Sequence, residues 1–193
     1  MRRGCLDIQP AFWIPAVIAL VVFPTRWVVA WVAAVVFHEL GHYLTLILFR
    51  VSVHSVSIKL TGAYMYTAPM SVGQESVVAA AGPVFSLILI FFARWIPSTA
   101  FCAFFQLVFN VLPFPGFDGG RILGNCLQVF LPERKVKVVM WSLQVVVLAV
   151  IGIVAVTLRW SILVLMTAVI LFVRIGRVTF PCKHRKQIVQ WCK

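Results

Sequence analysis

Two histidines and a glutamate form the most reactive cluster in this sequence. His38, Glu39 and His42 occur in the pattern HExxH, inside a run that is otherwise apolar. Residues four apart on an α-helix differ by roughly 40° around the axis and roughly 6 Å along it, so both imidazoles share one face and can hold one zinc ion. Glu39 can then act as the base for an attacking water. The spacing predicts a hydrolytic zinc site.

A catalytic zinc site needs a third protein ligand, and the sequence offers few. Asp118 follows a stretch rich in proline and glycine at residues 112–117, which stops one helix before the next begins. A carboxylate at the positive end of a helix dipole is favoured in its ionised, metal-binding form. We therefore predict Asp118 as the third ligand. Glu75 and Glu133 are expected to be solvated at loop edges. The candidates that stay open are His54, Cys102 and Cys126, although we interpret both cysteines as packing residues.

The composition places this site in a membrane. Of the 193 residues, 62% are hydrophobic and 11% are charged, against roughly 25% charged residues in an ordinary soluble domain. Ionisable groups at bilayer depth cost free energy unless partners or a metal compensate them, so their presence there indicates function. The net charge of +12 points to loops facing anionic lipid, and we expect no nucleic-acid partner. The five cysteines contain no CxxC pair, so no disulfide framework is expected.

Apolar runs predict six transmembrane helices, since each needs about 20 mostly apolar residues. The expected segments are 8–23, 27–49, 77–93, 97–131 with a break in its middle, 138–158 and 160–175. Outside these spans, only Arg26, Arg94 and Arg159 fall on the side opposite the N-terminus. The excess of basic residues on the other side places both termini in the cytoplasm. We expect one domain over residues 1–176 and a basic cytoplasmic tail over residues 177–193.

The loop over residues 50–76 predicts a short β-hairpin against the membrane. Val56 and Ile58 alternate with polar residues, and a phase slip near His54 and Ser55 indicates a β-bulge. Residues 61–63 provide the turn. An interfacial loop without strand pairing stays the alternative. The expected fold class is an all-α polytopic membrane protein with six transmembrane helices and a membrane-associated β-hairpin between the second and third.

Two motifs together resemble the site-2 protease family of intramembrane zinc metalloproteases. HELGH at residues 38–42 is followed by NVLPFPGFDGG at residues 110–120. Ala81, Gly82 and Pro83 resemble the family's small-residue signature in the intervening span. The likeness covers roughly residues 27–131 and looks closest to the sporulation-type subgroup, which processes a membrane-associated transcription-factor precursor. We expect neither a PDZ insert nor the C-terminal CBS domain that many members carry.

The resemblance implies a set of roles for these residues. Three ligands would hold one zinc ion per chain: His38, His42 and Asp118. Glu39 would be the catalytic base. Asn110 would contact the substrate, with a helix–helix hydrogen bond as the alternative for its amide. Arg121 lies three residues after Asp118 on the same helix face, where it would either orient that carboxylate or snorkel to the membrane surface.

Other functions fit parts of the pattern. A membrane metal-ion transporter can also place His and Asp side chains within a bilayer, but it has no need of Glu39. A different class of membrane metalloprotease takes its third ligand from a downstream glutamate. A catalytically silent protein that holds a partner helix is the non-enzyme alternative. Because all the residues needed for hydrolysis are present, we predict a zinc metalloendopeptidase of the cell membrane. Its expected partners are a membrane-associated protein substrate, the lipid bilayer and a regulatory membrane protein.

Overall fold

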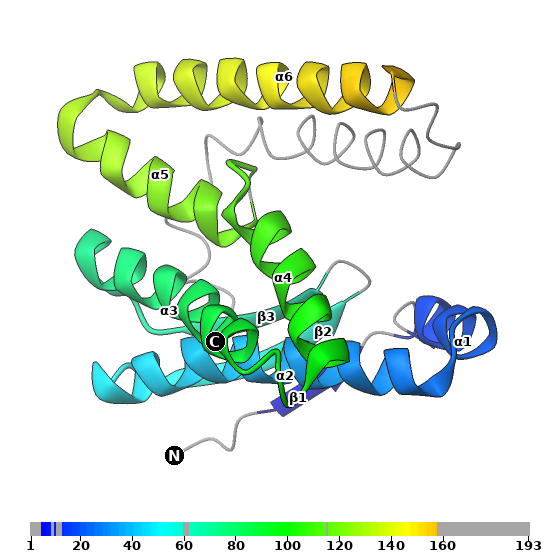
Figure 1. Ribbon diagram of the computed structural model, residues 1–193. Coiled ribbons are helices and arrows are strands. Elements are labelled where there is room, and N and C mark those ends of the chain that lie inside the picture. The colour runs from blue at the N-terminus through cyan, green and yellow to red at the C-terminus, as the bar shows by residue number, and fades with distance from the viewer. Residues whose placement is uncertain (1–4, 9, 11–12, 60–61, 115, 158–193) are drawn as a thin grey trace.

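The computed structural model describes residues 5–8, 10, 13–59, 62–114 and 116–157. In chain order the elements are β1 (Cys5–Ile8), α1 (Trp13–Val22), α2 (Thr25–Leu48), β2 (Val53–Lys59), β3 (Gly62–Thr67), α3 (Val72–Phe91), α4 (Pro97–Val111), α5 (Asp118–Phe130) and α6 (Glu133–Thr157). Helices α2, α3 and α4 pack together, and α5 leads from them to α6 (Figure 1).

Three of these helices are long and apolar enough to cross a bilayer: Thr25–Leu48, Val72–Phe91 and Glu133–Val154. They correspond to the second, third and fifth of the six expected spans. The shorter apolar helix α4 has 15 residues. Large apolar side chains are exposed on every helix of the described chain, as expected where lipid covers the surface.

The prediction of a first span over residues 8–23 was wrong for the described residues. Helix α1 has only 10 residues, about half of what a bilayer requires. Ile8 instead belongs to strand β1. Pro15 lies in the first turn of α1, the part of a helix where a missing N–H is tolerated. The expected sixth span, at residues 160–175, and the basic tail lie outside the described residues.

The predicted break in the fourth segment is confirmed. Helix α4 ends at Val111, and α5 begins at Asp118. Leu112 adopts an extended conformation, as expected for a residue that precedes a proline. Gly116 has a φ of 91°, which glycine adopts without steric cost. The break therefore sets Asp118 at the first position of a helix.

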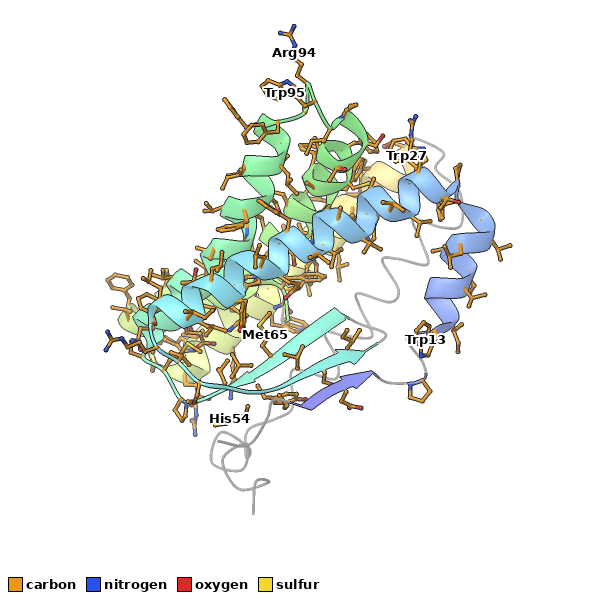
Figure 2. The ribbon with its side chains drawn as sticks, turned by 90° about the horizontal axis from the view of Figure 1, so that it is seen from below. Trp13, Trp27, His54, Met65, Arg94 and Trp95 are labelled. Carbon is orange, nitrogen blue, oxygen red and sulfur yellow. The ribbon has the colours of Figure 1, made fainter. Side chains whose placement is uncertain are left out.

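A three-stranded sheet occupies the predicted hairpin region, in the order β1-β2-β3. Strands β2 and β3 are antiparallel, and the register shifts between Val53 and Ser55, where the bulge was predicted. Gly62 and Ala63 pair with β2 and so belong to β3 rather than to the expected turn. The parallel strand β1 was not predicted, because its four residues carry too short a pattern. Figure 2 shows the strands along one side of α2.

Small side chains let the central helices approach closely. The core between α2, α3 and α4 contains Ala30, Ala34, Leu89, Cys102 and Ala103. A Cβ atom at Gly41 of α2 would lie 2.7 Å from the carbonyl oxygen of Ala81 in α3, as expected for a glycine that admits a neighbouring helix. Cys102 is a packing residue as predicted, whereas Cys126 was predicted to pack and is exposed on α5.

Candidate metal centre

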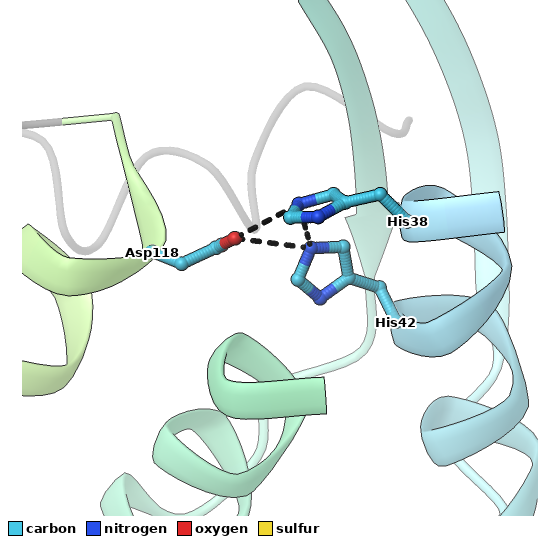
Figure 3. Close-up of side chains that lie close together, drawn as sticks. All are labelled: His38, His42 and Asp118. Atoms are coloured by element: carbon cyan, nitrogen blue, oxygen red, sulfur yellow. Dashed lines mark hydrogen bonds and ion pairs between the residues drawn. The ribbon is translucent and has the colours of Figure 1, made fainter. Parts of the chain in front are cut away.

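The structure brings His38, His42 and Asp118 together from two helices (Figure 3). His38 Nε2 lies 3.1 Å from Asp118 Oδ2 and 3.3 Å from His42 Nε2. His42 Nε2 lies 3.3 Å from the same carboxylate oxygen. The exposed fractions of the three residues are only 2%, 8% and 6%. Within the described part of the chain, they form the one group of three His, Cys, Asp or Glu residues placed to hold a metal ion.

The spacing of these three atoms fits a tetrahedral metal. A zinc ion about 2.0–2.2 Å from each donor keeps tetrahedral donors roughly 3.3–3.5 Å apart. The observed separations of 3.1–3.3 Å are close to that range. Two imidazoles and one carboxylate are also a common donor set for catalytic zinc, with a fourth position left for water.

The hydrogen bond of His42 gives a second reason to expect a cation. Its Nδ1 atom lies 2.7 Å from the backbone oxygen of Val78, which can only accept, so Nδ1 donates. In the neutral imidazole, Nε2 then presents a lone pair toward Asp118 Oδ2, which is also an acceptor. Two facing lone pairs repel each other unless a proton or a metal cation lies between them. The donors therefore fit a zinc ion.

Helix α3 orients both imidazoles from behind. His38 Nδ1 is hydrogen bonded to the fully buried Ser86 Oγ at 2.8 Å, and His42 Nδ1 donates to Val78. Gly82 lies between these two contacts, and a Cβ atom there would overlap both imidazole rings. Sequence reasoning missed Ser86 and Val78. The only available signal for Ser86 was a hydroxyl one helical turn after Gly82 in an apolar run, and a backbone oxygen such as that of Val78 carries no sequence signal at all.

All six predicted site residues line one cavity of about 390 Å³: His38, Glu39, His42, Asn110, Asp118 and Arg121. Glu39 is half-buried and opens onto the same space as the three donor atoms. Part of the cavity wall is apolar and includes Leu46, Met65 of β3 and Val78. Figure 2 shows Met65 between the strands and the helices. The cavity can thus hold an apolar polypeptide segment beside the donors and a carboxylate base.

Two of the predicted residues have partners that were not expected. Asn110 Nδ2 donates to the backbone oxygen of Gln106 in its own helix at 3.0 Å, rather than to another helix. Arg121 Nη2 lies 3.6 Å from Glu75 Oε1, so its ion pair is with α3 and not with Asp118. Glu75 was expected to be solvated, but it is half-buried in this pair. The role of Asn110 toward a substrate stays a prediction.

The chain resembles a known protein in structure. No family model and no curated protein matches this sequence. A solved structure does match, the site-2 protease from Methanocaldococcus jannaschii, with a TM-score of 0.67 and 15% sequence identity. The match covers 95% of this chain and 94% of that chain.

The chain shares the fold of that protease. The fold therefore agrees with the resemblance noted in the motifs. At 15% identity this likeness establishes the architecture, so the chemistry must be argued from the residues of the cavity.

Proposed function

We propose that this protein is an intramembrane zinc metalloprotease, which hydrolyses a peptide bond in or near the transmembrane segment of a membrane-associated substrate. The observation that carries the proposal is the triangle of donor atoms formed by His38, His42 and Asp118, with sides of 3.1–3.3 Å. Glu39 shares their cavity, and the fold is that of a site-2 protease.

The side chains of the cavity would have separate roles in peptide hydrolysis. When bound, a zinc ion would polarise the scissile carbonyl and make water a stronger nucleophile. His38, His42 and Asp118 would hold the ion, and the contacts from α3 orient the two imidazoles. Glu39 would take a proton from the attacking water and pass it to the departing amine. The apolar wall would exclude further water from the reacting peptide.

The sheet supplies a means to hold the substrate in extended form. A helical substrate hides its peptide bonds in backbone hydrogen bonds, so it must be opened before attack. Strand β3 lies at one edge of the sheet, and its Met65 and Thr67 line the cavity. We infer that an opened substrate adds to this edge as a further strand. Strand β1 covers the other edge of β2, which leaves β3 as the strand beside the site.

The place of the protein in the membrane belongs to the same proposal. We infer a multi-pass membrane protein with both termini in the cytoplasm, within one catalytic domain. Trp27 and Trp95 lie toward the same end of the helices in Figure 2, as interfacial aromatic residues do. The substrate class proposed from the motif resemblance is a transcription-factor precursor or its regulator, under the control of a membrane partner.

Purified protein in lipid vesicles would test the proposal, with single-span substrates and the variant Glu39→Gln. We expect wild type to cleave and the variant to lose cleavage while both retain one zinc per chain. A metal-ion transporter would instead keep its transport activity after Glu39→Gln. Absence of cleavage by the wild type across the substrates, together with zinc flux into the vesicles, would overturn the proposal.

A further inference from the structure

Arg121 is the one Lys or Arg side chain among the described residues that line the cavity. It lies on α5 one turn after Asp118, which is about 4.5 Å along the helix axis. A peptide in extended form advances about 3.3 Å per residue. Arg121 therefore begins one or two substrate residues along from Asp118, and its side chain lines the same cavity as the metal donors.

The ion pair between Arg121 and Glu75 is loose. The distance of 3.6 Å between Nη2 and Oε1 exceeds that of a direct hydrogen bond, and the side chains are 40% and 34% exposed. Partly exposed pairs of this kind contribute little to stability. A guanidinium carries five N–H donors in one plane. A carboxylate at one edge of the guanidinium can fix its orientation and leave the other N–H donors available. Glu75 is therefore suited to orient Arg121 toward the cavity.

We propose that Arg121 binds a substrate oxygen, and that Glu75 holds the guanidinium in position to do so. The oxygen belongs to a backbone carbonyl or to an acidic side chain, on the side of the scissile bond that faces the N-terminus of α3. Asn110 lines the cavity from the end of α4, so an extended peptide lying across the donors meets an amide and a guanidinium. This inference rests on the proposed proteolytic function.

The competing explanation is that the pair only ties α3 to α5. Reversing both charges, as Glu75→Arg with Arg121→Glu, separates the two explanations, because the reversed pair restores the tie but leaves a carboxylate on α5. We expect Arg121→Gln to lower kcat/KM by about 10- to 100-fold, mainly through KM, with zinc content unchanged. The double reversal should match the thermal stability of wild type and stay as inactive as Arg121→Gln. Arg121→Lys keeps the positive charge but loses the planar guanidinium. Its kcat/KM should lie between those of wild type and Arg121→Gln.

Two controls make the outcome decisive. Glu133→Gln removes an ion pair to Lys137 within α6, neither residue of which lines the cavity, and reports the effect of losing such a pair alone. Binding of an uncleaved substrate peptide to protein carrying Glu39→Gln measures affinity without turnover, and adding Arg121→Gln should weaken that affinity by a similar factor. Substrates with Glu or Gln near the scissile bond identify the oxygen: equal losses indicate a backbone carbonyl, and a loss confined to Glu substrates indicates a carboxylate.

Wild-type levels of cleavage and peptide affinity in the double reversal would overturn the role of Arg121. That result is distinct from failure of the proposed function, in which wild type itself would cleave no substrate.

Discussion

Gly82 in α3 faces the Nε2 atom of His38 in α2 so closely that a Cβ atom at position 82 would lie 2.6 Å from it. The same Cβ would also overlap the ring of His42. The two helices therefore meet at the metal donors themselves, and the glycine keeps the space that the imidazoles occupy. Helix α3 can approach the two histidines this closely only because position 82 has no side chain.

Replacing Gly82 with alanine should lower zinc affinity. The added methyl group must push at least one imidazole away from Asp118, and displaced ligand geometry typically costs about 10- to 100-fold in metal affinity. Competition with a chelator, followed by metal analysis of the purified protein, would measure the change. Gly73→Ala on the same helix is the matched control, because a Cβ there meets nothing within 4 Å. Equal zinc affinity in both variants would contradict the inference that a methyl group at position 82 displaces an imidazole.

Removing the Ser86 hydroxyl should also weaken zinc binding. Ser86→Ala leaves His38 Nδ1 without its buried partner, so the ring is no longer held toward Asp118. We expect a loss of about 10- to 100-fold in zinc affinity and a matching loss of cleavage at limiting zinc. Ser76→Ala removes an exposed hydroxyl bond within α3 and serves as the control. Unchanged affinity after Ser86→Ala would show that packing alone orients His38.

Asp118→Ala should abolish stable zinc binding at one ion per chain. Only two imidazoles would remain, and a catalytic zinc site requires three protein ligands. Zinc stoichiometry after dialysis would measure this, with Asp7→Ala in β1 as a control that removes a carboxylate of the sheet. Full retention of zinc in Asp118→Ala would mean that another residue, such as a downstream glutamate, is the third ligand.

Proline substitutions in β3 would test whether its edge binds substrate. Successive N–H groups of a strand point to opposite edges. Of the variants Met65→Pro and Tyr66→Pro, one therefore removes an N–H that points outward from the sheet, and the other removes a hydrogen bond to β2. We expect the outward substitution to lower cleavage by about tenfold or more while zinc content stays constant. Met65→Ala controls for loss of the side chain that lines the cavity. Undiminished cleavage in both proline variants would exclude strand pairing at this edge.

Features that depend on neighbouring residues along the chain could be predicted from sequence. Helical periodicity places His38 and His42 on one face whatever surrounds them. The prolines and glycine before Asp118 end one helix and begin another for local steric reasons, and the structure has that break. The alternation in β2 with its bulge near His54 is likewise a local pattern.

Features that depend on packing between distant segments required the tertiary structure. Glu75 rather than Asp118 pairs with Arg121, because the approach of α3 to α5 decides which carboxylate a long side chain reaches. Ser86 and the backbone of Val78 orient the histidines across an interface between helices, and β1 joins a strand some 50 residues away. The amino-acid sequence by itself thus determined which residues we propose for the chemistry, since their types and local spacing can be read from it. Only the tertiary structure decided their partners, because those contacts arise from how separate helices and strands pack in space.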